Sequence, residues 1–296
     1  MRPFIFILII PTSFLGQMLD NRGCAVFSGE PFFYTEFIRS NKIKSIKGVV
    51  STKADLQVIK SKGVSTEFFF DDSGNLIKQF DSFYRGKKKD SSITTYHYDE
   101  KKNITTKRMS DSYGFFSYNY GYNDNGDVVS KTYCRDENTT NNKNDFKLKK
   151  QYTIVNETYS YVQKDSCIQK NVHNNHGGVY QKEYYTYDEN QLLVKVEKKL
   201  IVNHKKAQTT FKYNNLMMVS EMTTQKDLGK GEYSRFVYKY DGLGNLEAID
   251  EYRNEELKTH KEVIYDKSTL LMKALLVQEV NSNFITITKF SYVFFE

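Results

Sequence analysis

The sequence predicts an all-β protein made of tandem β-hairpins, and three observations support this fold class. The 296 residues include 23 Tyr, 21 Phe and only 3 Pro, a composition that favours strands over helices or disorder. Aromatic and polar residues alternate over 116–122 and 284–294, which places the rings on one face of a strand. A short phrase also recurs at a nearly constant interval. The composition excludes collagen, a coiled coil and a disulfide-dense small protein.

Residues 1–16 are expected to form a signal peptide. Arg2 precedes the unbroken apolar run 4–10, and small residues lead to a cleavage point near Gly16. The run is too short to span a bilayer, so no transmembrane helix is expected in the mature chain. Export implies the periplasm, the outer-membrane surface or the extracellular space. Cys24 lies too far from the apolar run for a lipid anchor.

Residues 17–60 are expected to be an N-terminal cap followed by leading strands. The part 17–41 contains Phe27, Phe32, Phe33, Tyr34 and Phe37, which have the apolar bulk to cover the first hairpin. The stretches 42–50 and 56–64 alternate weakly and are candidate strands.

Residues 61–296 contain the recurring phrase, which reads aromatic, any residue, aromatic, Asp or Asn, a polar turn, and then an aliphatic residue. Successive second aromatics are 24 to 28 residues apart, with one exception of 39 residues. The 39-residue interval contains the polar stretch 135–151, which is rich in Asn and Lys. We expect this stretch to be a loop insertion. The second aromatics stand at Phe70, Tyr98, Tyr122, Tyr161, Tyr187, Tyr213, Tyr240, Tyr265 and Tyr292.

The acid or amide after each aromatic pair predicts a hairpin turn. Its side chain can accept hydrogen bonds from backbone N–H groups a few residues later, and a Gly three residues on can adopt the positive φ that closes the turn. These residues are therefore expected to have structural roles: Asp71, Gly74, Asp99, Asn123, Gly126, Asp188, Asn214, Asp241, Gly244 and Asp266.

Hairpins of this kind cannot bury an aromatic face alone, so they are expected to stack edge to edge. The result is one long antiparallel sheet that is twisted or curled on itself. If the array is modular, a chain truncated at residue 232 should still fold cooperatively.

The repeated unit resembles the YD repeat of the RHS (rearrangement hotspot) proteins. The best copies are 68–76, 120–128 and 238–246, and the resemblance covers about residues 60–296. It implies a spiralling β-sheet in a small exported bacterial protein. The chain is far too short for the closed shell of that family and has no toxin or core-associated segment after the last repeat, so encapsulation is not implied.

Few residues suggest chemistry. The formal net charge is +7, but the charges are interspersed and predict no nucleic-acid-binding stripe. His173 and His176 have no identifiable third metal ligand, and the repeated Asp residues suit turns better than a catalytic pair. No catalytic, cofactor or metal residue is expected. Cys134 and Cys167 either form a disulfide or stay separate buried thiols.

The predicted function is an exported, non-enzymatic binding or scaffold module. Its expected partner is a cell-envelope protein or a glycan, with Tyr133 and Tyr184 available to stack on sugar rings from the face opposite the main aromatic stripe. One alternative is a secreted, glycan-directed hydrolase with an unrecognised site. The other alternative is an outer-membrane β-barrel. A barrel needs an apolar outer band, and the faces opposite the aromatics are expected to carry Lys78, Lys131, Lys195, Lys239 and Lys289.

Overall fold

The computed structural model describes residues 17–296 except 55, 112–113, 141, 165–166 and 283. The predicted signal peptide over 1–16 lies outside the described residues. None of the described helices is long and apolar enough to cross a membrane.

The chain forms one short helix, α1 (Thr35–Ser40), and eighteen strands. The strands are β1 (Ile43–Ala54), β2 (Lys60–Phe70), β3 (Leu76–Arg85), β4 (Lys88–Tyr98), β5 (Ile104–Asp111), β6 (Gly114–Tyr122), β7 (Val128–Asn138), β8 (Leu148–Lys164), β9 (Cys167–His173), β10 (Val179–Tyr187), β11 (Leu193–Leu200), β12 (Lys206–Tyr213), β13 (Val219–Gln225), β14 (Ser234–Tyr240), β15 (Leu246–Arg253), β16 (Glu256–Tyr265), β17 (Met272–Glu279) and β18 (Phe284–Phe294).

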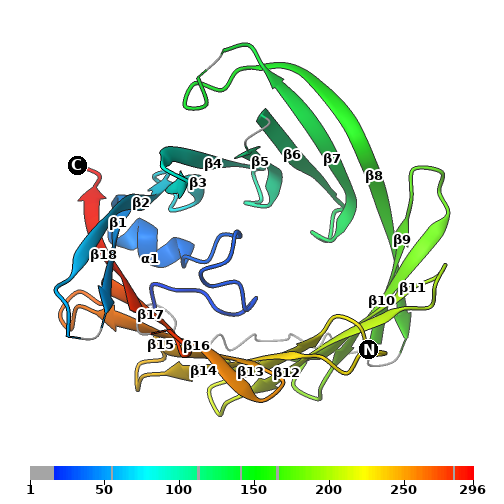
Figure 1. Ribbon diagram of the computed structural model, residues 1–296. Coiled ribbons are helices and arrows are strands. Elements are labelled where there is room, and N and C mark those ends of the chain that lie inside the picture. Colours follow the sequence, from blue (N-terminus) through cyan, green and yellow to red (C-terminus); the bar gives the residue numbers. More distant parts are fainter. Residues whose placement is uncertain (1–16, 55, 112–113, 141, 165–166, 283) are drawn as a thin grey trace, which may run out of the picture.

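The eighteen strands close into a barrel (Figure 1). Every strand pairs antiparallel with its neighbour in sequence, and β1 pairs with both β2 and β18. The β1–β18 ladder runs from Ile43 opposite Phe294 to Ala54 opposite Phe284. The all-β antiparallel prediction is confirmed, but the predicted long, twisted or curled sheet of repeats is corrected, because the sheet closes into a barrel. Closure pairs the two edges that an open sheet would expose.

Alternation gives the barrel a lumenal face and an outer face. Tyr96 and Lys107 are opposite each other on β4 and β5, and both contact the N-terminal segment inside the barrel, which identifies the lumenal face. Lys131 lies on this face too, because it is opposite Tyr120. The prediction that Lys131 lies on the other face of the sheet from the aromatic rings is therefore wrong. The same register places Tyr133 opposite Tyr118 on the lumenal face, which corrects its predicted position.

The two ends of the barrel differ. The hairpins that join each even-numbered strand to the next contain most of the predicted Asp or Asn turns, and we call this the Asp-turn end. The hairpins that join each odd-numbered strand to the next lie at the other end, the loop end. The first strand starts and the last strand finishes at the Asp-turn end.

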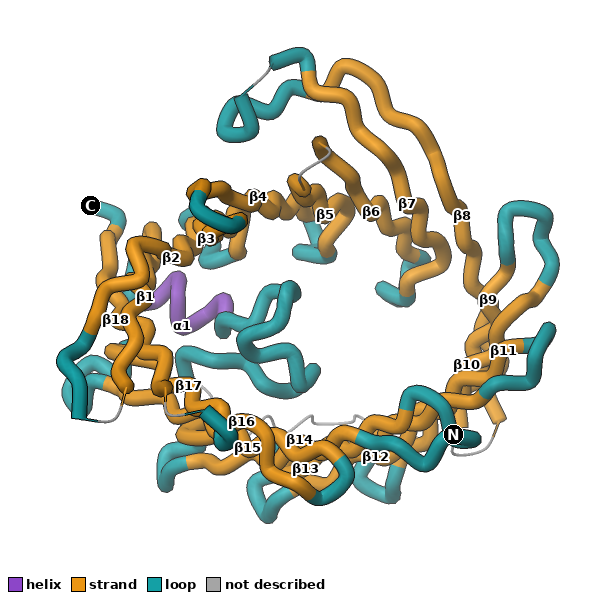
Figure 2. Tube along the Cα trace, in the orientation of Figure 1, coloured by secondary structure: helices purple, strands orange, loops and turns teal. Residues whose placement is uncertain are grey.

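Residues 17–41 form a plug inside the barrel (Figure 2). The plug lies near the Asp-turn end, where Asn21 Nδ2 donates to Tyr240 Oη (2.9 Å) and the Met272 backbone N–H contacts Met18 Sδ (3.3 Å). It packs on strands from both ends of the chain, so its core joins residues far apart in sequence. The expected covering role of 17–41 is thus performed from within the lumen.

Stacked rings hold the plug against β2. Phe33 lies 5.0 Å from Phe68 and 5.2 Å from Phe70 between ring centroids, in edge-to-face geometry. Phe32 stacks on Phe33 at 4.5 Å. Complete burial of one such ring contributes roughly 1.5–3 kcal/mol, so this group is a main anchor of the plug.

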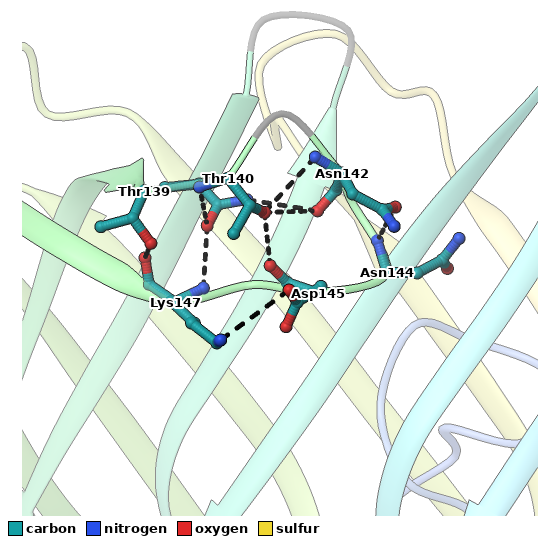
Figure 3. A network of polar contacts seen from close by, with 7 residues as sticks. Thr139, Thr140, Asn142, Asn144, Asp145 and Lys147 are labelled. Atoms are coloured by element: carbon teal, nitrogen blue, oxygen red, sulfur yellow. Dashed lines mark hydrogen bonds and ion pairs between the residues drawn. The ribbon is translucent and has the colours of Figure 1, made fainter.

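The loop between β7 and β8 is the longest hairpin connection, and it spans 139–147 rather than the predicted 135–151. Figure 3 shows its internal network: Thr140 Oγ1 donates to the Asp145 carbonyl (2.5 Å), and the Lys147 N–H donates to Asn138 Oδ1 (2.8 Å). Phe146 packs on Phe115, with the ring centroids 4.5 Å apart. Because Phe115 faces outward, the loop covers part of the outer wall.

Candidate functional site

The predicted turn residues lie in seven hairpins, with one Asp or Asn acceptor in each turn. The Asn75 N–H donates to Asp71 Oδ1 and the Asn103 N–H donates to Asp99 Oδ1, both at 2.8 Å. The same acceptor role, again for a backbone N–H four residues later, is filled by Asn123, Asp188, Asn214 and Asp241. Asp266 accepts from the Ser268 and Thr269 N–H groups. Gly74, Gly126 and Gly244 adopt φ values of +83°, +85° and +86°.

These turns do not assemble a reactive site. Each carboxylate serves its own hairpin, so the acids are spread around the Asp-turn end rather than paired. Within the described part of the chain, no three His, Cys, Asp or Glu residues gather in a way that could hold a metal ion.

The cysteines are free thiols. Cys134 is buried on β7 opposite Thr153, and Cys167 lies on β9 opposite Lys164. The candidate Cys134–Cys167 disulfide is therefore not formed, because β8 separates the two strands.

The two histidines considered as metal ligands have separate surroundings. His173 Nδ1 donates to the Gly177 carbonyl (3.0 Å), which leaves Nε2 to accept from Ser160 Oγ at 2.9 Å. The His176 N–H donates to Asn174 in the turn. The Ser160–His173 pair lies exposed on the outer wall, so it lacks the dry, enclosed setting that nucleophilic catalysis needs.

The richest cluster of polar groups lies on the lumenal face of β8 to β11. Its centre is Glu183, which is only 5% exposed. Glu183 accepts from Tyr185 Oη (2.6 Å) and from Gln181 Nε2 (2.7 Å). The ammonium groups of Lys170 and Lys198 each lie 3.5 Å from its carboxylate oxygens.

A second carboxylate, Glu157, extends this cluster. Tyr159 Oη donates to Glu157 at 2.8 Å, and Tyr180 Oη donates to its other oxygen. Lys170 Nζ sits 3.8 Å from the centroid of the Tyr159 ring, which joins the two carboxylates through a cation–π contact. We call this set the lumenal cluster: Glu157, Tyr159, Lys170, Tyr180, Glu183, Tyr185 and Lys198.

The lumenal cluster keeps its buried acid charged. Burial by itself raises the pKa of Glu183, but the hydrogen bond from Tyr185 and the charges of Lys170 and Lys198 outweigh it, so the pKa is lowered. Burial, followed by the hydrogen bond to Glu183, raises the pKa of Tyr185. The cluster is thus a fixed array of charges and hydroxyls at neutral pH.

The lumen beside this cluster is open to solvent. Tyr152, Val155 and Tyr161 of β8 share the lumenal face and are 39%, 42% and 37% exposed. The plug packs mainly against β1 to β4 and β12 to β18, so it leaves this side of the wall uncovered. Tyrosine rings and charged groups are therefore accessible to a molecule within the barrel.

Among the cavities that the described residues form elsewhere, two are next to the plug and to the β13–β14 connection. One of about 220 Å³ lies between the plug and the Asp-turn end of β12 to β15, and Tyr34, Tyr213 and Met218 line it with Arg22. The other, of about 590 Å³, lies at the loop end beside the β13–β14 connection, among charged side chains such as Lys226 and Arg253. Neither of them brings predicted site residues together.

Sequence reasoning missed the lumenal cluster. Its members are single Glu, Lys and Tyr residues from four strands, with no local motif. Alternation assigns each to a face, but the register that makes them neighbours comes from strand pairing.

No family model and no curated protein sequence matches the chain. Solved structures similar to it include a porin-like protein from Bacteroides uniformis, with 11% identity over 85% of this chain and 98% of the other, at a TM-score of 0.39. A porin-like protein from Bacteroides vulgatus has 11% identity and the same coverage, at a TM-score of 0.36. A TcdB2–TccC3 structure has 12% identity over 78% of this chain and 15% of the other, at a TM-score of 0.31.

The suspected resemblance to the RHS repeat proteins is wrong. The resemblance implied a spiralling sheet, whereas the repeated units close into an eighteen-stranded barrel. The repeated phrase specifies a hairpin turn with a register shift beside it. Such hairpins occur in a closed barrel as well as in a sheet of stacked repeats. Of the functions that the sequence left open, the outer-membrane β-barrel agrees better with this closed barrel than an open scaffold sheet does.

Proposed function

We propose that the protein is a β-barrel of the bacterial cell envelope that works at the outer membrane and binds a polyhydroxylated ligand in its lumen without catalysing a reaction. The observation that carries the proposal is closure of an even number of antiparallel strands in sequence order. Bacterial outer-membrane barrels have this strand arrangement. The expected export signal supports the same location.

The outer wall determines how such a barrel meets the membrane. Lys212 and Arg235 pair with Glu221 on the outer face, at 2.7 and 3.4 Å, and Lys239 pairs with Asp250 at 2.9 Å. The side chains of Lys212 and Lys239 are 72% and 57% exposed. A Lys or Arg facing lipid at the bilayer midplane costs about 2–4 kcal/mol. This charge distribution favours a wall in water, with the membrane contacted by an end of the barrel.

The lumenal cluster supports a glycan as the ligand. Tyrosine rings offer flat apolar faces for sugar rings, and the charged groups beside them can bind hydroxyls. Both carboxylates already accept hydrogen bonds from two side chains, which suits a fixed binding surface better than proton transfer.

Cell fractionation tests the location. The chain is expected in the outer-membrane fraction and should be released by high salt or carbonate without detergent, because its wall is charged. Recovery from the cytosol would contradict the proposal, and resistance to every wash except detergent would contradict the polar wall.

Ligand binding tests the lumen. The chain has no Trp and 23 Tyr, so tyrosine fluorescence can report the binding of envelope oligosaccharides. Glu183→Gln should weaken binding, since it removes the charge that holds Lys170 and Lys198 in place. Glu197→Gln is the matched control, because Glu197 follows the lumenal Val196 on β11 and therefore faces outward. Equal affinity of the two variants would contradict the lumenal site.

A further inference from the structure

Two neighbouring hairpins at the loop end expose apolar side chains. The β1–β2 hairpin presents Leu56, Val58 and Ile59, which are 107%, 77% and 51% exposed. The β17–β18 hairpin presents Val280 and Phe284, which are 42% and 56% exposed. We call these five residues the tip patch.

Barrel closure brings the two hairpins together. Ala54, at the end of β1, is directly opposite Phe284, at the start of β18, and Lys53 is opposite Ile285. The two segments are more than 200 residues apart in sequence, so the tip patch exists only in the closed barrel. Exposed apolar groups clustered in this way mark an interaction surface.

Lysines surround the tip patch. Lys53, Lys60 and Lys62 are exposed on the strand ends that carry the β1–β2 hairpin, and none of them forms an ion pair within the described part of the chain. Two acids belong to these hairpins, Asp55 just before Leu56 in the sequence and Glu279 at the end of β17, so the three lysines leave an excess of positive charge. Apolar tips ringed by Lys are typical of segments that enter the interface of an anionic bilayer.

The two ends of the barrel also differ in charge: the loop end is positive and the Asp-turn end is negative. The described turns of the Asp-turn end carry three lysines against ten acids: Asp71, Asp72, Asp99, Glu100, Asp124, Asp127, Asp188, Glu189, Asp241 and Asp266. The described loops of the loop end carry four acids against six lysines: Lys87, Lys143, Lys147, Lys205, Lys226 and Lys230. An anionic surface would attract the loop end and repel the Asp-turn end.

We propose that the loop end docks on an anionic phospholipid surface, with the tip patch inserted among the headgroups and Lys53, Lys60 and Lys62 paired with lipid phosphates. This inference rests on the proposed envelope location and adds the partner and the orientation. The charged outer wall stays in water, and the lumen stands over the membrane with its plugged end pointing away.

The exposed apolar groups favour a bilayer over a soluble polyanion. A nucleic acid or acidic polysaccharide would use the lysines but would leave Leu56 and Val58 in water. The Asp-turn end also exposes Leu216, Met217 and Leu243, at 59%, 62% and 64%, but these residues lie among acids. They provide a control of similar apolar exposure and opposite charge.

The test is co-sedimentation of the full chain with vesicles of phosphatidylcholine alone or with phosphatidylglycerol added. Binding is expected only to the anionic vesicles and should weaken with salt. The triple variant Leu56→Ser, Val58→Ser, Ile59→Ser should lower the bound partition at least about tenfold. Replacing Lys53, Lys60 and Lys62 with Gln should cost about fivefold per lysine.

The control variant Leu216→Ser, Met217→Ser, Leu243→Ser should bind as the wild type does. Equal loss in the control, or equal binding to neutral vesicles, would overturn the orientation. Binding to heparin or DNA that survives the tip-patch substitutions, without vesicle binding, would replace the membrane with a polyanion. Recovery of the chain in the outer-membrane fraction despite absent vesicle binding would reject this docking mode and leave the proposed location intact.

Discussion

At the scale of single residues, the hairpin turns depend on one acceptor and one permissive backbone position. Asp in some turns and Asn in others accepts the same backbone N–H, as Asp99 and Asn214 do. The shared requirement is therefore an oxygen at that position rather than a charge. In most turns the residue three positions later has positive φ, and it is Gly74, Gly126 or Gly244 in some turns and Lys102, Gln191 or Met217 in others. Gly is therefore favoured at this position but is not required, and its surroundings vary from turn to turn.

Gly74 and Gly126 form a matched pair for measuring how tightly the plug packs. Both have positive φ, so Ala at either position should cost roughly 1–2 kcal/mol from the backbone alone. A Cβ at Gly126 meets open space, whereas a Cβ at Gly74 would overlap the Thr35 carbonyl oxygen of the plug. Gly74→Ala should therefore lose roughly 1–3 kcal/mol more than Gly126→Ala. Chemical denaturation measures the difference, and equal losses would mean that the plug does not press on this turn.

Asp99 should contribute to acid sensitivity. Hydrogen bonds from the Asn103 side chain and backbone lower the pKa of Asp99. Its stabilising effect is complete above the unfolded pKa of about 3.9 and is lost as the pH falls through the lower folded value. Asp99→Asn should thus lower the Tm at pH 7 and have a smaller effect in acid, so that the decline of Tm below pH 4 becomes shallower. Asp72→Asn, in a neighbouring turn, is the control, and an unchanged acid decline in Asp99→Asn would refute the assignment.

At the scale of the hairpin element, the second aromatic of the phrase has a second role. Its ladder register shifts beside the turn, and its hydroxyl donates to the backbone carbonyl that opens an earlier strand. Tyr240 donates to Val219 at 2.7 Å, and Tyr265 donates to Leu246 at 3.0 Å. The same bond is made by Tyr98, Tyr122, Tyr161, Tyr213 and Tyr292. Each tyrosine therefore ties its hairpin to the preceding one.

Tyr265→Phe tests this hydroxyl contact. The ring stays in place, but the Leu246 carbonyl loses a side-chain donor, which should cost about 1 kcal/mol. Tyr84→Phe is the control, because Tyr84 is 53% exposed and its side chain makes no such bond in the described structure. Urea denaturation compares the two variants, and an equal, negligible change would show that the hydroxyls do not link neighbouring hairpins.

At the scale of the whole molecule, closure and the plug make the strands interdependent. Strand β1 needs β18 as a partner, and the plug needs Tyr238, Leu246 and Met272 from the C-terminal strands as well as Phe68 and Phe70 from β2. A modular array would tolerate the loss of terminal repeats. When its C-terminal strands are removed, a closed barrel loses both the β1–β18 ladder and much of the core around the plug.

A chain truncated at residue 232 should therefore fail to fold cooperatively, in contrast to the expectation for a modular array. The cut removes β14 to β18, so β1 becomes an open edge and the plug loses half of its contact wall. The full chain should unfold in one transition, and the fragment should be degraded rapidly by protease. A sharp, sigmoidal denaturation curve for the fragment would restore the modular description.

The sequence by itself determined the all-β class, the alternation of faces and the hairpin turns, because these depend on residues within about ten positions of one another. Asp71 and Gly74, or Asp241 and Gly244, carry their turn chemistry locally. Only the tertiary structure decided that the sheet closes, that 17–41 fills the lumen, and that Glu157 and Glu183 share one cluster. Those outcomes depend on the curvature accumulated over eighteen strands and on pairings such as Ile46 with Tyr292, for which the chain contains no local signal.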